Sequence, residues 1–343
     1  MDALTAITRT RKKGIIILAL SLAGAALAAL NIGWVSIPFM DTVRALAGLD
    51  RAIAPETGII ITDVRLPRIL LDMAVGAGLA VSGCAMQAIF RNPMASPFVT
   101  GISSGGAFGA ALVIILGLPA ALTGPSAFAF ALATAFFVYG LARSDRGVPV
   151  ETLLLAGIAV SFFFSAMVAF MQYMADEKQL REIILWTMGR LWEADWPRVA
   201  LALPVVAGGS VILMFFSREL NLMIISERAA LGMGVETGKA RAAVLVLVSL
   251  ITGAAVSVSG VIGFVGLIVP HVMRMTIGPE HRYLLPASAL GGALFLVIAD
   301  TLARTVMSPV ELPVGIITSL CGVPFFLFLL KNKKGMTGFS YGT

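Results

Sequence analysis

Long apolar runs recur along the whole chain, and they constrain its fold more than any other feature of the sequence. A bilayer core requires about 20 consecutive apolar residues for each helix that crosses it. Ten candidate spans of this kind can be read from the 343 residues: 14–33, 69–90, 98–116, 121–142, 152–174, 199–216, 242–260, 261–277, 284–303 and 312–330. The eighth run is short, and Pro270 interrupts it. The sequence therefore predicts an all-α, polytopic membrane helical bundle of about ten spans.

The composition is typical of a chain whose solvent is largely lipid. Hydrophobic residues make up 58% of the chain and charged residues only 13%, which is too little charge to cover a soluble domain of this length. The net charge of +6 does not indicate nucleic-acid binding, because the basic residues form short clusters between apolar runs. No polar linker divides the chain, so residues 1–343 are expected to form one transmembrane domain.

The distribution of Lys and Arg predicts the orientation of the bundle. With ten spans and both termini inside, the inner segments hold 16 of the 25 basic residues and 7 of the 19 acidic ones. The inner side then carries a net charge of +9 and the outer side −3. Because cytoplasmic segments are enriched in Lys and Arg, we expect both termini and loop 217–241 to be cytoplasmic. A cleaved signal peptide is the alternative for the first run, since Ala26-Leu27-Ala28 follows a basic segment.

A short pattern that occurs twice predicts an inverted internal repeat. Val81–Gly83 is followed by Pro93, and Val258–Gly260 is followed by Pro270, each proline ten residues past the glycine. The two copies are five spans apart, so they would run in opposite directions across the membrane. Inverted repeats are common in transporters, with the substrate route between them. Chance is the alternative, because these residue types are frequent in membrane helices.

The sequence shows no catalytic constellation. The only histidines, His271 and His281, lack a Cys or carboxylate partner at metal-ligand spacing, and no nucleotide-binding loop is present. Asp72 and Asp300 lie near predicted outer ends of spans, where they give little support to an ion-coupled carrier. We therefore expect this chain not to be an enzyme and to bind no cofactor or metal. Its energy is expected to come from a partner that hydrolyses ATP.

Segment 217–241 is the candidate for receiving that energy. It combines two short helical patterns with a glycine turn, and it is longer than the connections usual in compact bundles. The candidate coupling residues are Glu227, Ala230, Leu231, Gly232 and Gly234. Gly232 is expected to permit the turn, because glycine tolerates backbone conformations that other residues avoid. An ordinary loop between two spans is the alternative.

Eight short stretches between residues 63 and 330 carry a more specific signal. They are Arg65–Arg68, Arg91–Pro97, Gly101–Gly105, Leu153–Gly157, Gly263–His271, His281–Pro286, Ala299–Arg304 and Glu311–Gly315. In this order they resemble the FecCD-type permeases of type II ABC importers, which carry iron–siderophore complexes, haem and cobalamin. Any one stretch is weak, but all eight in order are highly specific.

The resemblance implies a permease subunit that moves an iron chelate of the siderophore type, or a related metal complex such as cobalamin or haem, into the cytoplasm. It implies a multi-pass protein of the cytoplasmic membrane that forms a homodimer. The implied partners are two cytoplasmic ATPase subunits and an extracytoplasmic substrate-binding protein. An ion-gradient-driven secondary transporter is the alternative, since an inverted repeat fits both classes.

The resemblance also implies roles for residues at both ends of the bundle. Arg65, Arg68 and Arg304 match arginines that face outward and meet acidic residues on the binding protein. Snorkelling to lipid headgroups is the alternative for these arginines. Val150 and Glu151, just before the fifth span, match a cytoplasmic gate, although small polar residues are usual there.

The route is expected to follow the two-fold axis between two permeases, lined largely by the fifth span. The candidate lining residues are Phe163, Met167, Phe170 and Met171. Gap-filling in a membrane helix is the alternative, because Met packs adaptably. Siderophores, haem, cobalamin and oxyanions all remain open as cargo.

Overall fold

The computed structural model describes residues 2–49, 53–143 and 148–331, and all regular structure within these ranges is helical. Seven of the described helices are long and apolar enough to cross a membrane. They are α1 (Asp2–Asn31), α4 (Leu66–Ile89), α6 (Thr123–Ala142), α7 (Val150–Met174), α9 (Trp196–Phe215), α12 (Thr237–Ser259) and α14 (His281–Ala303). Three shorter helices are α5 (Ile102–Ile115), α13 (Val265–Thr276) and α15 (Val314–Lys331). Each of the ten apolar runs in the sequence therefore contains one helix.

The two shortest of these helices fall well below a full crossing. At 1.5 Å per residue, α5 and α13 are about 21 and 18 Å long, against a hydrocarbon core of about 30 Å. The helix of the eighth run is shorter than a span because non-helical backbone at 260–264 precedes α13. Pro270 lies inside α13 and does not end it. Gly260 and Phe264 instead adopt positive φ angles of 70° and 68°, and these residues separate α12 from α13.

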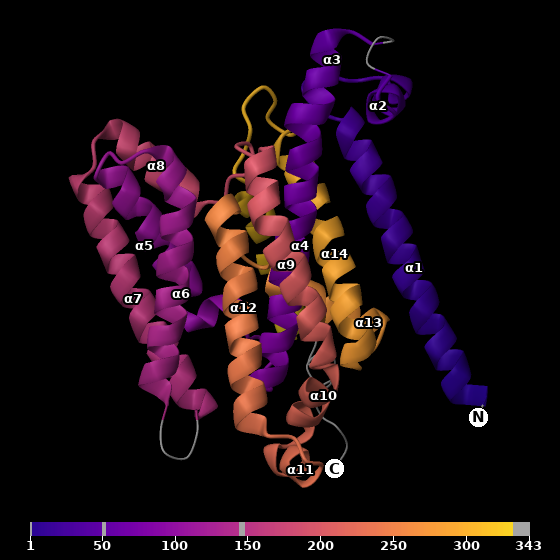
Figure 1. The fold of residues 1–343 in the computed structure, drawn as a ribbon, viewed down its shortest axis with the longest axis vertical. Helices are drawn as coiled ribbons and strands as arrows, with labels where there is room; N and C mark the ends of the chain where they lie inside the picture. Colours follow the sequence, from indigo (N-terminus) through magenta and orange to yellow (C-terminus); the bar gives the residue numbers. More distant parts are fainter. Residues whose placement is uncertain (1, 50–52, 144–147, 332–343) are drawn as a thin grey trace.

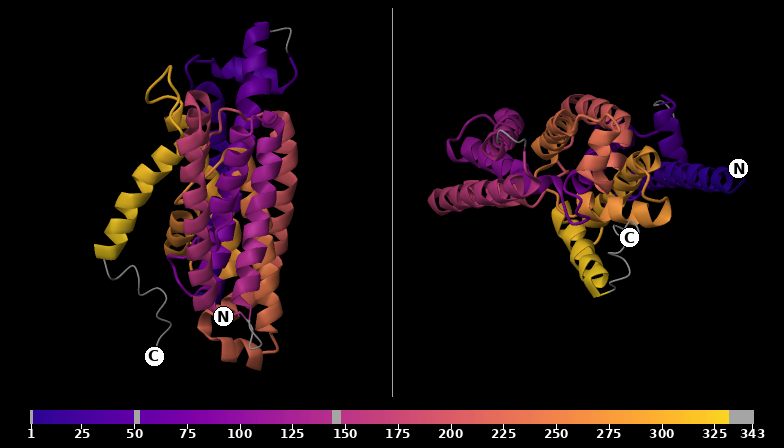
Figure 2. Two further views of the ribbon diagram at one scale, coloured as in Figure 1. Left: turned by 90° about the vertical axis from the view of Figure 1, so that its left-hand side faces the viewer. Right: turned by 90° about the horizontal axis from the view of Figure 1, so that it is seen from below.

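The long helices form two groups, and α1 and α15 lie outside both (Figure 1). A central group consists of α4, α9, α12, α13 and α14, and a lateral group consists of α5, α6, α7 and the short helix α8 (Glu177–Thr187). α1 packs against α14 on the side away from the lateral group, and α15 leans away from the centre (Figure 2). The shorter elements between these helices are α2 (Phe39–Leu46), α3 (Pro55–Ile59), η2 (Ile60–Arg65), η3 (Pro97–Thr100), η4 (Ala120–Leu122), α10 (Ser217–Ile225) and α11 (Glu227–Gly232).

Two ends of the bundle can be named from Figure 1. The α8 end carries α2, α3 and α8, and the α11 end carries α10, α11 and the start of α1. The start of α1, the end of α6 and the start of α12 lie at the α11 end, so these segments, all predicted to be cytoplasmic, share one end of the bundle (Figure 1). The membrane side that each end faces stays a prediction from the charge distribution. Lys333 and Lys334, which contribute to that distribution, lie outside the described residues.

The backbones of the central helices touch where glycines remove the side chains. A Cβ atom added at Gly83 of α4 would overlap the Gly266 carbonyl oxygen of α13, and one added at Gly76 would overlap the Gly292 carbonyl oxygen of α14. Small residues allow this close approach, which is a principal source of helix association in lipid. α4 is consequently buried along almost its whole length and forms the axis of the fold.

The two copies of the predicted repeat differ in local conformation. Val81–Gly83 lies within helix α4, whereas Val258–Gly260 includes the end of α12. α4 runs from the α8 end toward the α11 end and α12 runs back, so the two copies do point in opposite directions (Figure 1). The inverted repeat as a whole stays a prediction.

Candidate translocation and coupling sites

A groove runs along one side of α7. Two adjoining hollows of about 480 and 370 Å³ share Phe98, Ser161 and Ser165 as lining residues. Beside the groove, Gly157 lets α7 pack directly on the Val99 carbonyl group. Ser161, Ser165 and Gln172 follow helical spacing, so they share one face of α7. We call the surface lined by these residues and by Ser103 and Ser104 of α5 the α7 groove.

The α7 groove continues toward α15. Thr187 and Val261 line the hollow of about 370 Å³, and they also line a third hollow of about 720 Å³. Ser319 of α15 lines this third hollow as well. The described side chains that line these three hollows supply hydroxyl groups, amides and apolar surface, and none of them is charged. Such a lining can form hydrogen bonds with a passing solute without holding it through a full charge.

The aromatic and methionine residues predicted to line the route occupy other positions. Phe163, Met167 and Phe170 are spaced by four and three residues, which places them on the face of α7 opposite the serines. The side chains of Phe163 and Phe170 are exposed, and Met171 packs against the cluster of α5 and α8 residues. The structure thus assigns the hydroxyl face of α7 to the groove. Phe163, Met167 and Phe170 do share one face of α7, but helical spacing alone does not say what that face contacts.

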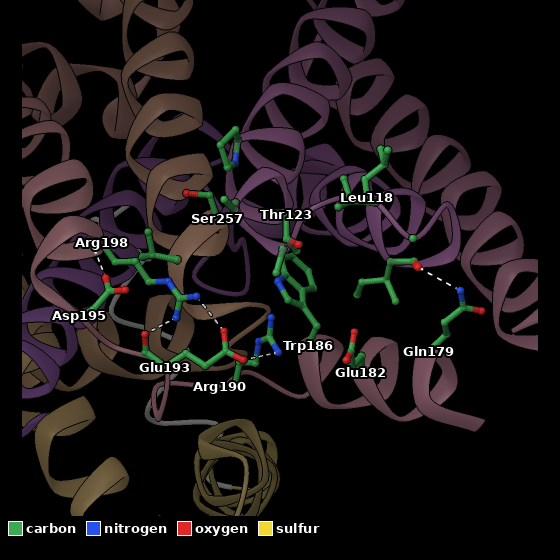
Figure 3. Close-up of a pocket in the computed structure, with 18 of the residues that line it drawn as sticks. Leu118, Thr123, Gln179, Glu182, Trp186, Arg190, Glu193, Asp195, Arg198 and Ser257 are labelled. Carbon is green, nitrogen blue, oxygen red and sulfur yellow. Dashed lines mark hydrogen bonds and ion pairs between the residues drawn. The ribbon is translucent and has the colours of Figure 1, made fainter. Parts of the chain in front are cut away.

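A polar cleft of about 690 Å³ opens at the α8 end between the lateral and central groups (Figure 3). Two capped helix starts shape it. Asp176 forms a capping box with Gln179 at the start of α8, and Asp195 accepts a hydrogen bond from the Arg198 amide at the start of α9. The Gln179 side chain also donates to the Ile114 carbonyl group, so it ties α8 to the end of α5.

Arg190 projects into this cleft toward Glu193 (Figure 3). The Arg190–Glu193 ion pair measures 2.6 Å, and Arg198 contacts the same carboxylate at 2.9 Å. Burial lowers the pKa of the Arg190 guanidinium from its ordinary value, although the Glu193 charge opposes that change. Two cations share one carboxylate here, so the cleft is a mixed-charge surface.

The arginines expected to face a binding protein are buried in this structure. Arg68 forms a paired hydrogen bond with Asp300 at 2.8 and 2.9 Å and contacts Glu311 at 2.8 Å. The side chains of Arg68 and Asp300 are only 7% and 2% exposed. Asp72 is buried beside them. We call Arg68, Asp72, Asp300, Arg304 and Glu311 the α8-end cluster.

Arg65 and Arg304 form hydrogen bonds with the last turn of α1 and with the segment that follows it. Arg65 donates to the carbonyl groups of Leu30 and Val35, and Arg304 donates to the Ala29 carbonyl group at 2.6 Å. Ala29 and Leu30 lie in the last turn of α1, where a helix leaves carbonyl groups without an internal partner. These contacts hold the three arginines within the fold, and their role in docking a binding protein stays a prediction. The spacing of Arg65 and Arg68 gave no sign of carboxylate and carbonyl partners that lie far away in the sequence.

The α10–α11 segment ends in a compact turn built on Gly234. The Val235 amide donates to the Ala230 carbonyl group and the Gly234 amide to the Leu231 carbonyl group, the pattern of a Schellman motif. Gly234 has φ = +80°, whereas Gly232 is still part of α11. The prediction that Gly232 permits the turn is thus wrong, and Gly234 fills that role. Two glycines this close together cannot be told apart by sequence alone.

The same segment presents apolar side chains at the α11 end. Ile225, Leu231 and Met233 are 58, 55 and 60% exposed, while Ala230 is fully buried. Exposed apolar side chains beside charged ones are typical of a protein contact surface. Of the proposed gate residues, Val150 opens α7 and is partly buried, and Glu151 is exposed.

Polar contacts at the α11 end also involve residues that the sequence analysis did not select. Arg91 donates from Nε to the Met223 carbonyl group at 2.8 Å, and its backbone φ is +47°. A non-glycine residue in that conformation is uncommon, and it indicates a local constraint. Arg241 is buried on α12 and contacts Glu227. Arg91 lies within a stretch used for the resemblance, but nothing in its spacing predicts these contacts.

Comparisons with known proteins agree with the geometry. The family model described as the FecCD transport family matches residues 17–332. The cobalamin import system permease protein BtuC of Halobacterium salinarum is 46% identical over 82% of this chain and 76% of its own length. The hemin transport system permease protein HmuU of Yersinia pestis is 44% identical over 79% of this chain and 83% of its own length.

A solved structure supports the same assignment. An inward-facing conformation of a metal-chelate type ABC transporter matches with a TM-score of 0.84 and 35% identity. The match covers 94% of this chain and 99% of that one. Sequence and fold therefore point to one family along nearly the whole length.

Proposed function

The chain belongs to the FecCD transport family, and from this premise we propose that its α7 groove forms half of the pathway for a bulky metal chelate. The observation that carries the proposal is the continuous uncharged groove on α5, α7, α8 and α15, in which serine, threonine and glutamine side chains lie among apolar ones. The groove is open on one side of this chain. A second copy would close it, and the pathway would then lie between two permeases.

The lining supports a cargo that keeps its own ligands. Among the described residues no group of three or more His, Cys, Asp or Glu side chains could hold a metal ion. A metal enclosed in a chelator needs no such ligands, and its polar outer atoms can exchange hydrogen bonds with hydroxyl groups. Relatives named for cobalamin and hemin fit this description of the cargo. We propose a chelate of that size class.

The energy for import is proposed to come from two ATPase subunits that bind the α10–α11 segment. The exposed Ile225, Leu231 and Met233 supply an apolar contact, and Glu227 is the first residue of α11, the helix that contains Leu231. The chain itself is proposed to bind no nucleotide or other cofactor. A binding protein is proposed to deliver the chelate at the α8 end, which would face the outside of the cytoplasmic membrane.

The ion-gradient alternative gains no support from the buried carboxylates. Asp300 is held by Arg68 through two hydrogen bonds, so its charge is compensated inside the fold. A carboxylate that carries a coupling ion must be free to exchange partners during transport. The α8-end cluster therefore fits a structural role better than an ion-coupling one.

Transport by proteoliposomes tests the proposal. The chain is reconstituted with its ATPase subunits and binding protein, and uptake of cyanocobalamin, haemin and ferric citrate is measured separately with ATP inside or outside. We expect ATP-dependent uptake of at least one of these chelates. Absence of uptake for all three, with ATP hydrolysis intact, would contradict the proposed cargo class.

A pair of matched variants tests the groove itself. Ser165→Phe places a bulky side chain in the groove and should reduce uptake by about tenfold or more, because the constriction blocks a bulky solute. Phe170→Leu changes the opposite face of the same helix and should leave uptake close to that of the unaltered chain. Unaltered uptake by Ser165→Phe would move the route away from the α7 groove.

A further inference from the structure

Arg241 joins two segments that are far apart in the sequence. Its Nη1 donates to the Val148 carbonyl group at 2.8 Å, and its Nη2 donates to Glu227 at 3.2 Å. The Arg241 side chain is only 7% exposed. One guanidinium on α12 therefore connects the start of α11 with the residue two positions before α7 begins.

The Val148 carbonyl group is available for this bond because of the local sequence. Pro149 is the N-cap of α7, and the first helical hydrogen bond runs from the Leu153 amide to the Pro149 carbonyl group. The carbonyl group before the N-cap has no place in the helical ladder. A buried carbonyl group without a partner is unfavourable, and the Arg241 guanidinium supplies a charge-assisted bond.

Glu227 is the other end of the connection, and it gathers contacts from several elements. Its Oε1 accepts from Arg241 and from the Thr237 hydroxyl group, each at 3.2 Å. Its Oε2 lies 3.9 Å from Arg91, which follows α4. The Glu227 side chain is 44% exposed, so the carboxylate lies at the surface while its partner Arg241 is buried. A displacement of α11 would act directly on these bonds.

We propose that Arg241 is a positioning residue that transmits displacement of α11 to the start of α7. The inference rests on the proposed function, because it assumes that an ATPase moves α11 during transport. When α11 is displaced, the Glu227 carboxylate moves and the Arg241 guanidinium moves with it. The hydrogen bond from Arg241 then either pulls on the Val148 carbonyl group or breaks. Val148 immediately precedes the Pro149 cap, so the first turn of α7 with Val150 and Glu151 moves with it.

The chemistry of arginine suits this role better than that of lysine. A guanidinium presents several N–H donors in a rigid planar fork, so two acceptors in different directions can be held at a fixed separation. A lysine ammonium is a point charge on a flexible stem, and it transmits no fixed geometry between two partners. Arg241→Lys should therefore keep the buried charge and the fold but weaken the connection.

The first experiment measures chelate uptake and ATP hydrolysis together in the reconstituted complex. Arg241→Lys and Arg241→Gln should hydrolyse ATP at near-unaltered rates while the number of chelates moved per ATP falls by about fivefold or more. Lys239→Gln is the matched control, since it removes one positive charge from the same helix, and among the described residues Lys239 forms its ion pair with Glu236. Its ratio of uptake to hydrolysis should be unchanged.

The second experiment separates transmission from a purely structural role. Spin labels at Gly232→Cys and Thr152→Cys report the displacement of α11 and of the start of α7, and both positions are exposed. Adding ATP should shift both labels in the unaltered background and only the α11 label in Arg241→Lys. If both labels still shift and the uptake ratio is unchanged in Arg241→Lys, the inference is overturned. A folded complex that moves no chelate even without the substitution would instead refute the proposed function.

Discussion

Buried arginine–carboxylate contacts occur at both ends of the bundle, but the two sets differ in how far they are closed. In the α8-end cluster both Arg68 and Asp300 are almost fully buried, and they form two parallel hydrogen bonds. At the α11 end the partner of buried Arg241 is Glu227, whose side chain is 44% exposed and which accepts at the longer distance of 3.2 Å. A closed, bidentate pair fixes helices in place, whereas a pair with one exposed member can rearrange when a partner binds.

The largest expected effect is the loss of the closed pair. Asp300→Ala leaves the Arg68 guanidinium buried, with the partly exposed Glu311 as its remaining ion-pair partner among the described residues, so we expect a loss of about 3–5 kcal/mol in the free energy of unfolding. Thermal unfolding in detergent, followed by retention on size-exclusion chromatography, measures this loss. Arg241→Gln removes the buried arginine that contacts Glu227 at the α11 end, and it should be the less destabilising change. Equal destabilisation by both changes would remove the distinction between the two ends.

The turn after α11 should show an intermediate effect. Gly234→Val forces a β-branched residue into a left-handed conformation, which costs about 1–2 kcal/mol locally and should distort the Schellman motif. Gly232→Val is the matched control, because a Cβ atom at Gly232 meets no other atom and its φ is not positive. Copurification of the ATPase with each variant is the measurement. We expect weaker copurification with Gly234→Val, and a reversed order would restore the turn to Gly232.

The contrast between the two ends also shows what the sequence could predict. Each of the ten apolar runs located one helix of the described chain, since the length of a membrane crossing is imposed by the bilayer. The buried contacts were not predicted, because Arg68 and Asp300 are 232 positions apart and only the packing of α4 on α14 brings them together. On α7 the sequence analysis selected aromatic and methionine residues, and it did not consider the serines on the opposite face. The face that lines the groove depends on α5 and η3, so the spacing within α7 did not determine it.

A smaller effect is expected at Glu311, and it tests how far the α8-end cluster is closed. Glu311 is the more exposed partner of Arg68, so Glu311→Gln should lower the free energy of unfolding by about 1 kcal/mol or less. A binding protein that uses Arg68 must displace Glu311 from it. In that case Glu311→Gln speeds association of the binding protein, as measured by surface plasmon resonance at low salt. An unchanged rate would indicate that Arg68 serves the fold alone.

The smallest expected effect concerns the fully exposed pair Lys239–Glu236, 2.6 Å apart at the start of α12. Its side chains are 83% and 69% exposed, so water and salt screen the attraction and neither group is desolvated when the chain folds. Glu236→Gln should therefore leave the unfolding temperature unchanged at both low and high salt. Glu227→Gln changes the same functional group in the neighbouring helix, but there the carboxylate has the buried partner Arg241. Glu227→Gln should lower the unfolding temperature measurably, and equal behaviour of the two variants would show that burial of the arginine gives the α11-end contact no added strength.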